Sequence, residues 1–96
     1  MVYCITYDLN KSGKDYKGVI QAIKDAGDQG CCSFGKSAWL IKSSIKSAQA
    51  IYSMIEPHID SDDTCLVIEA KLNYAGRFED YNIEIIRDVI FKPRPR

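Results

Sequence analysis

The order in which strand-like and helix-like segments follow one another is the feature that most restricts the fold of this chain. Residues 2–9 form an almost continuous apolar run rich in Val, Ile, Tyr and Thr, which predicts a central strand. A second run, TCLVIEAKL, covers residues 64–72. Between them, GCCSFGKSAWLIKS predicts two short strands at about 31–34 and 37–42, with Gly35 at the bend.

Two amphipathic segments separate these strands and predict two helices. Apolar residues recur at helical spacing in each segment, namely Tyr16, Val19, Ile20, Ile23 and Ala26 in the first and Ile45, Ala48, Ile51, Tyr52 and Ile55 in the second. Ser12 and Asp15 resemble a capping box before the first helix, and Gly27 is a stop signal after it. Pro57 is expected to end the second helix or distort its last turn.

The resulting β-α-β-β-α-β order is that of the split β-α-β arrangement. Two right-handed crossovers place the strands in an antiparallel sheet of order 4-1-3-2, with both helices on one face. We therefore predict an α+β fold, a ferredoxin-like βαββαβ sandwich. The bare face of the sheet then needs a cover, which a second copy of the chain or the residues after 72 would provide.

The chain divides into a predicted domain over residues 1–76 and a C-terminal extension over residues 77–96. A helix at about 79–90 is favoured in the extension, because apolar residues fall on two helical stripes, Tyr81, Ile85 and Val89 on one and Ile83, Ile86 and Ile90 on the other. A strand over 83–91, which could be swapped between subunits, is the alternative. Pro93 and Pro95 cannot continue either element, since they lack the amide donor.

Composition excludes several classes of protein. With 96 residues, the chain is long enough for one small domain. Its 13 basic and 13 acidic residues cancel, so no global charge indicates nucleic acid or a membrane. No stretch approaches the ~20 apolar residues that span a bilayer, and no signal peptide is evident. We expect a cytoplasmic protein that does not bind a membrane.

The four cysteines are expected to be free thiols. Cys31 and Cys32 are adjacent, which strains a disulfide between them, and we expect all four cysteines to be mostly buried, small apolar residues. The paired Cys-x2-Cys spacing of a zinc site is absent.

Acidic residues are the candidates for chemistry. Asp8 ends the first apolar strand, where an aspartate either starts a turn by binding backbone amides or ligates a metal. Asp60, Asp62 and Asp63 lack the glycine and the distant glutamate of a calcium loop, so we predict a solvated turn. His58, the single histidine, is a weak candidate for a general base.

Lysine and arginine residues form two candidate patches for binding the phosphates of RNA or DNA. One follows Asp8 in the first loop and helix, and the other ends the chain. A solvated, disordered terminus is the alternative for the second patch. The candidate residues are Lys11, Lys14, Lys17, Arg87, Lys92, Arg94 and Arg96.

Three segments in this order resemble a known family. They are the strand end Tyr7-Asp8-Leu9 within YCITYDLN, the strand Ser37-x-Trp39-Leu40-Ile41, and the turn NYAG at residues 73–76. Together they are similar to the CRISPR-associated adaptation proteins of the Cas-two family, and more closely to their stand-alone SinR-like relatives. The resemblance extends from about residue 2 to residue 76.

The resemblance implies a ferredoxin-like homodimer in antiviral defence. It implies that Asp8 of each chain lies near its two-fold mate and that the pair binds one divalent cation, Mg²⁺. Members of the family act as metal-dependent endonucleases on RNA or DNA, or as nucleic-acid-binding subunits without catalysis. A hard cation suits this chemistry, because it polarises a phosphoryl oxygen and acidifies a bound water.

Two departures from the family keep other functions open. Residues 1–76 contain no arginine, which disfavours a scaffold for duplex DNA, and the tail does not match the family's fifth strand. A first alternative is a non-catalytic protein-interaction module of a mobile element or phage, which binds a protein partner in a defence complex. A second alternative is a toxin-type ribonuclease.

Overall fold

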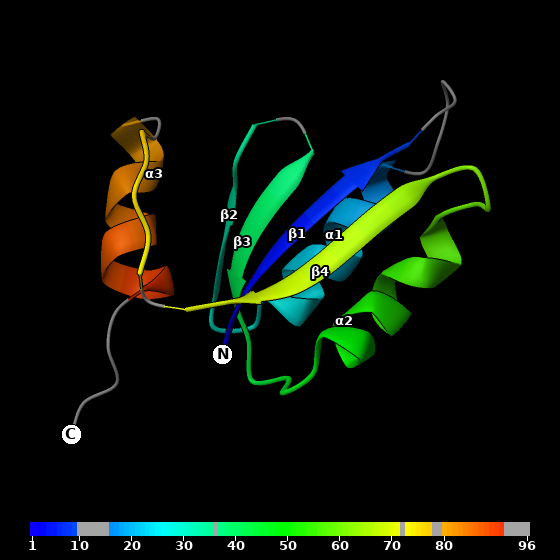
Figure 1. Ribbon diagram of the computed structural model, residues 1–96, viewed down its shortest axis with the longest axis horizontal. Helices are drawn as coiled ribbons and strands as arrows, with labels where there is room; N and C mark the ends of the chain where they lie inside the picture. The colour runs from blue at the N-terminus through cyan, green and yellow to red at the C-terminus, as the bar shows by residue number, and fades with distance from the viewer. Residues whose placement is uncertain (10–15, 36, 72, 78–79, 92–96) are drawn as a thin grey trace.

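The computed structural model describes residues 1–9, 16–35, 37–71, 73–77 and 80–91. These residues form an α+β fold with a four-stranded antiparallel sheet, which confirms the predicted class (Figure 1). The elements in chain order are β1 (Val2–Asp8), α1 (Tyr16–Ala26), β2 (Gly30–Ser33), β3 (Ala38–Lys42), α2 (Ala48–Ile55), the 3-10 turn η1 (Glu56–His58), β4 (Thr64–Ala70), α3 (Asp80–Ile85) and the π-helical turn η2 (Ile86–Ile90).

The sheet has β1 at its centre. The strands lie in the order β2-β3-β1-β4, which is 4-1-3-2 when it is read from the β4 edge. All neighbours are antiparallel, and Ile5 of β1 lies opposite both Trp39 of β3 and Val67 of β4. The first strand therefore connects the two halves of the sheet.

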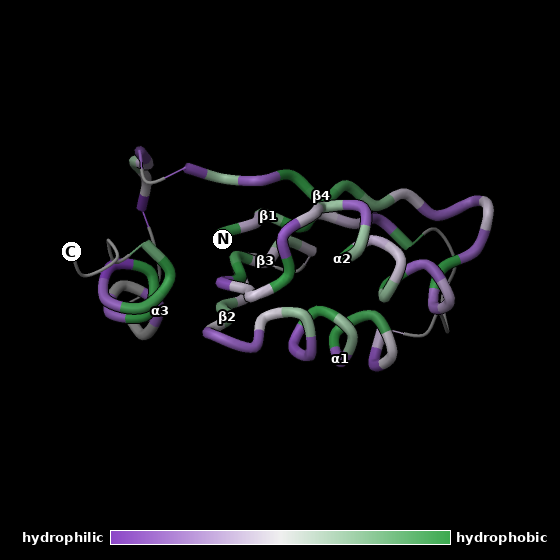
Figure 2. The backbone as a smooth tube through the Cα atoms, turned by 90° about the horizontal axis from the view of Figure 1, so that it is seen from below, coloured by the Kyte–Doolittle hydropathy of each residue, from purple (hydrophilic) through white to green (hydrophobic). Residues whose placement is uncertain are grey.

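Successive side chains of β1 point to opposite faces of the sheet. Tyr3, Ile5 and Tyr7 are buried in the main core beneath α1 and α2, and Figure 2 shows both helices on the same side of β1 and β4. The rest of this core includes Val19, Ile23, Ile41, Ile51 and Ile55. Because Tyr3, Ile5 and Tyr7 face the helices, the residues between them face the other way.

The second helix begins later than its apolar pattern predicted, so the inclusion of Ile45 was wrong. Ser47 is the N-cap, and its side-chain oxygen accepts a hydrogen bond from the Ala50 N–H at 2.9 Å. Such a cap fixes the start of a helix at the next residue. Ile45 still packs against the main core from the preceding loop, and Pro57 lies in η1 as expected of a helix terminator.

The other boundaries differ from the expected ones by one or two residues. β1 ends at Asp8, β2 and β3 begin at Gly30 and Ala38, and β4 ends at Ala70. The predicted capping box of Ser12 and Asp15 lies outside the described residues.

The tail forms a helix, as favoured from its apolar stripes, and not the alternative strand. η2 continues α3 with a wider turn, in which the Phe91 N–H donates to the Ile86 carbonyl. The tail helix lies beside β2 and β3, on the face opposite to α1 and α2 (Figure 1). It forms a second apolar cluster that contains Val2, Cys32, Leu40, Ala70, Ile85, Ile86, Ile90 and Phe91.

One buried polar contact orients the tail helix on the sheet. The Asn82 side-chain amide donates to the Ser33 carbonyl at 2.9 Å, and Asn82 is buried. Gly30 brings the helix close to β2, because a Cβ added at this glycine would lie 2.6 Å from Cγ1 of Val89. The φ angle of Gly30 is 149°, which side chains rarely adopt.

We expect Gly30→Ala to destabilise the fold more than Gly35→Ala. Both glycines have positive φ, but an added Cβ at Gly35 meets no atom within 4 Å. The clash with Val89 is expected to add roughly 1–3 kcal/mol to the loss at Gly30, the usual cost of overpacking. Denaturant unfolding measures both losses. Adding Val89→Ala should recover part of the loss in Gly30→Ala, and equal losses for the two glycine variants would contradict this packing.

Candidate functional site

Asp8 is exposed at the end of the central strand. Its side chain points to the face opposite to Tyr7, because neighbouring residues of a strand alternate, and Tyr7 is buried in the main core. In the sheet, Asp8 lies opposite Thr64, the first residue of β4. The β1–β4 register thus brings Asp8 next to the turn that precedes β4.

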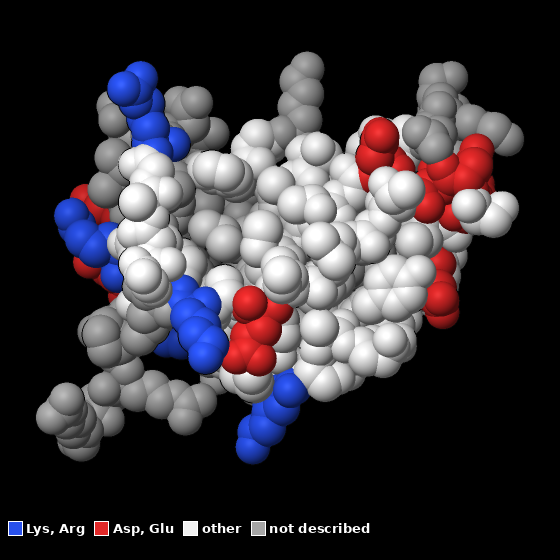
Figure 3. Space-filling view, viewed as in Figure 1, with Lys and Arg blue, Asp and Glu red and all other residues white. Residues whose placement is uncertain are grey.

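We call the part of the sheet that neither α1 and α2 nor the tail helix covers the open face. Two of its residues are large, apolar and more than half exposed, Leu66 at 57% and Ile68 at 55%. Figure 3 shows a largely uncharged surface over the strands. The residues of the open face are Cys4, Thr6, Asp8, Ala38, Thr64, Leu66 and Ile68.

Asp8 is the charged residue of this open face, and it stands at one end. An exposed carboxylate next to apolar surface can ligate a hard cation, but a single aspartate supplies at most two oxygen ligands. A complete site therefore needs oxygens from water, from a phosphate or from another chain.

The acidic turn between α2 and β4 lies at the same end of the sheet. Carboxylate oxygens of Asp60, Asp62 and Asp63 lie within 4.8 Å of one another. The Asp63 carboxylate accepts the Asp60 N–H at 2.8 Å, and the Asp63 N–H donates to the Asp60 carbonyl at 3.1 Å. These bonds form a tight turn, as the sequence predicted, and the turn adds negative charge beside Asp8.

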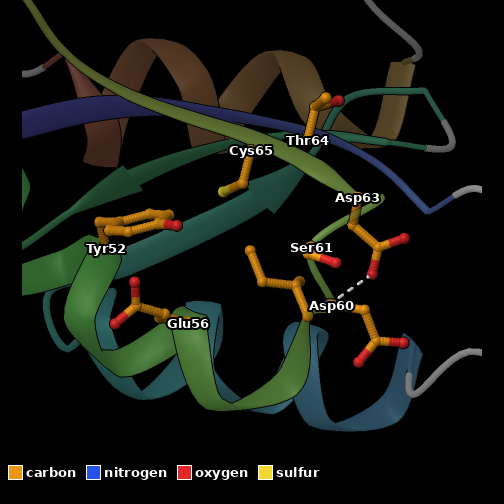
Figure 4. A pocket seen from close by; sticks show the side chains of 8 residues that line it. Tyr52, Glu56, Asp60, Ser61, Asp63, Thr64 and Cys65 are labelled. Carbon is orange, nitrogen blue, oxygen red and sulfur yellow. Dashed lines mark hydrogen bonds between the residues drawn. The ribbon is translucent and has the colours of Figure 1, made fainter.

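A pocket of about 430 Å³ opens between the end of α2 and the start of β4. In Figure 4, Tyr52 borders it on α2 and Glu56 on η1, while Asp60 and Asp63 border it on the turn. Ile59, Ser61, Thr64 and Cys65 complete the lining. Sequence reasoning missed this pocket, because the only local signal is the i, i+4 spacing of Tyr52 and Glu56, which is common on helices.

The two reactive side chains of the pocket are neutral at physiological pH. Burial raises the pKa of the Cys65 thiol above its ordinary value. Burial, and after it the negative charge of Glu56, raises the pKa of the Tyr52 hydroxyl. A thiol needs its thiolate form to act as a nucleophile, so neither group is activated for covalent catalysis.

The structure separates the two candidate basic patches. Lys17 is exposed in the first turn of α1, close to the Asp8 end of β1. The ring centroids of the neighbouring residues Tyr16 and Tyr7 are 6.3 Å apart, which places the start of α1 at this end. Arg87 is exposed in the tail helix, which packs on Val2 at the other end of β1. It is paired with Asp88 at 2.9 Å. The remaining candidates, Lys11, Lys14, Lys92, Arg94 and Arg96, lie outside the described residues.

The chain matches no protein-family model and no curated protein. The resemblance to the Cas-two family therefore rests on the residues of the sequence itself. Within the described residues, no helix has both the length and the apolar character required to cross a bilayer. All four cysteines are free thiols.

We predict that Cys65 reacts slowly with iodoacetamide at neutral pH, because its raised pKa keeps the thiolate population low. The rate should rise as the pH approaches the raised pKa. Peptide mapping by mass spectrometry measures the modification of this residue, and the same chain unfolded in urea is the control. Modification at pH 7 as fast as in the unfolded chain would contradict a neutral, inactive thiol.

Proposed function

We propose that this chain is a ferredoxin-like, Cas-two-like cytoplasmic protein that works as a homodimer and cleaves phosphodiester bonds of RNA or DNA with Mg²⁺ bound at Asp8. One observation carries the proposal. Asp8, at the strand end that resembles the Cas-two family, is an exposed carboxylate at one end of an apolar sheet face, and this face is not covered within the described chain.

The apolar open face supports association with a second copy. Leu66 and Ile68 expose large apolar side chains, and a small domain gains stability by burying such surface. If two open faces pack about a two-fold axis near their Asp8 ends, the two carboxylates approach each other. Facing carboxylates repel unless a cation or a proton lies between them, so this arrangement favours a shared cation.

The residues at this end suit a site for Mg²⁺ more than a site for covalent catalysis. Asp8 would provide a hard oxygen ligand in each subunit, and Mg²⁺ commonly completes its shell with water and substrate phosphate. When bound, the ion would polarise a phosphoryl oxygen and lower the pKa of a bound water. Lys17, exposed near the same end, would attract the phosphate backbone.

A second candidate is a non-catalytic module that binds a protein of a defence complex. The separation of Lys17 from Arg87 favours it, because these two described candidates do not form one basic surface. Apart from Asp8, the open face is also uncharged, which suits a protein interface more than a phosphate backbone.

We predict that Asp8→Ala abolishes Mg²⁺-dependent cleavage of RNA or DNA and leaves the fold intact, because Asp8 is exposed and outside both apolar clusters. Cleavage is measured on labelled single-stranded RNA and duplex DNA, and the fold by circular dichroism. Asp25→Ala is the matched control, since Asp25 is an exposed acid on α1. Cleavage by Asp8→Ala at the wild-type rate would contradict a catalytic cation site at Asp8, whereas absence of cleavage in the wild type would favour the non-catalytic module.

Mg²⁺ is also expected to strengthen the homodimer, because it removes the repulsion between two Asp8 carboxylates. Sedimentation equilibrium with and without Mg²⁺ measures the dimer dissociation constant. The constant should fall in the wild type and stay unchanged in Asp8→Asn, which lacks the charge. An equal response of both proteins would show that the cation acts elsewhere.

A further inference from the structure

The outer edge of β4 is an exposed strand edge. In the described sheet, β4 pairs with β1 alone, so one side of this seven-residue strand presents backbone N–H and C=O groups outward. The strand contains no proline and no bulge within its register to β1. Proteins commonly shield such edges, because they pair with strands of other molecules. The outward N–H and C=O groups of β4 can therefore form hydrogen bonds with another extended segment.

The neighbouring helix leaves this edge accessible. A groove of about 240 Å³ separates α2 from the outer side of β4, and it is lined by Ala48, Gln49, Tyr52, Cys65, Leu66 and Val67. Cys65 and Val67 point toward α2 but are only partly buried, in contrast to the fully buried Ile5 of the central strand. The edge is thus neither paired nor closed by α2.

The charges at the two ends of β4 have opposite signs. Asp63 precedes the strand and Lys71 follows it, while Glu69 is the only charged residue within it. An antiparallel second copy of β4 would place its acidic start beside the basic end of the first copy. Two copies of this edge, when arranged antiparallel, are therefore complementary in charge.

We propose that β4 pairs with β4 of a second copy, antiparallel and centred on Val67. In this register, Leu66 lies beside Ile68 of the second copy on the open face, so two exposed apolar side chains of each chain cover each other. Cys65 lies opposite Glu69 of the second copy. One residue beyond the strand ends, Asp63 lies beside Lys71 of the second copy, and the symmetry repeats this pair.

Other registers fit less well. A shift that centres the pair on Leu66 sets Asp63 opposite Glu69 of the second copy, and like charges in that position destabilise a sheet. A register in which Leu66 lies opposite Val67 of the second copy would put the open faces of the two copies on opposite sides of the joined sheet, because side chains alternate along a strand. Leu66 and Ile68 of one copy would then not meet those of the other. The register centred on Val67 pairs all seven residues of β4 without a like-charge contact.

This interface is distinct from the one in the proposed function. It uses the edge of β4, whereas the shared cation needs the Asp8 ends of two open faces to meet. Edge pairing joins two four-stranded sheets into one continuous sheet and leaves the Asp8 end of each open face uncovered. The two associations can therefore be tested and fail independently.

Glu69→Cys tests the register through the native Cys65. Directly opposed residues of antiparallel strands have Cα atoms about 4.5–5.5 Å apart, a separation that a disulfide bridges. The thiol at position 69 should form a disulfide with Cys65 of the second copy under mild oxidation, with two electrons passing to an added oxidant such as oxidised glutathione. Non-reducing electrophoresis and peptide mapping identify a dimer linked between positions 65 and 69.

The matched control is Glu69→Cys combined with Cys65→Ser, which should lose this cross-linked dimer. Equal cross-linking in the two proteins, or no dimer in either, would overturn the proposal. The cross-linking result does not bear on cleavage by the wild type or on its loss in Asp8→Ala. The proposed function is therefore tested separately.

The charge pairing gives a second test in the otherwise native protein. Lys71→Glu places like charges beside Asp63 of the second copy twice, which should raise the dimer dissociation constant roughly 2- to 30-fold at low salt. The increase should shrink in high salt, which screens exposed charges. Lys24→Glu, the same change on the exposed side of α1, is the control and should leave the constant unchanged. Equal constants for the two variants would overturn the charge pairing.

Discussion

The strict alternation of side chains along β1 is the constraint on which the rest of the structure depends. Tyr3, Ile5 and Tyr7 occupy the main core, so Asp8 must point to the opposite face at the end of the same strand. A slip of one residue would bury the carboxylate and expose the aromatic rings. The position of the candidate metal ligand is therefore fixed by the same packing that stabilises the domain.

Within the described residues, the tail helix covers only one end of the second sheet face. The tail helix protects the end that contains Val2, Cys32 and Leu40, and Asn82 holds it there through one buried hydrogen bond. It does not reach Leu66 and Ile68, which remain more than half exposed. A small domain buries a limited share of its surface, and both proposed associations use the part of β4 that the described residues leave open.

The balanced total of charges conceals an uneven distribution. Asp8 and the acidic turn lie at one end of the sheet, whereas Arg87 lies on the tail helix near the other. An acidic surface repels phosphate unless a cation intervenes, so nucleic acid would approach this end only together with a metal ion or basic side chains. The same acidic end complements Lys71 when a second β4 lies antiparallel to the first.

The sequence by itself determined the order of the strands and of the first two helices and the place of Asp8 at a strand end, because these follow from local periodicity and side-chain alternation. For the tail it favoured a helix but left a strand open, and the structure shows the helix. The sequence did not determine that α2 begins only after Ser47 and leaves out Ile45. The apolar pattern includes Ile45, but the cap at Ser47 sets the start of the helix. Only the tertiary structure decided that the turn before β4 lies beside Asp8, that Tyr52, Glu56 and Cys65 share a pocket, and that Lys17 and Arg87 lie apart. The reason is that strand register and helix packing bring together residues distant in sequence, and no local pattern encodes those pairings.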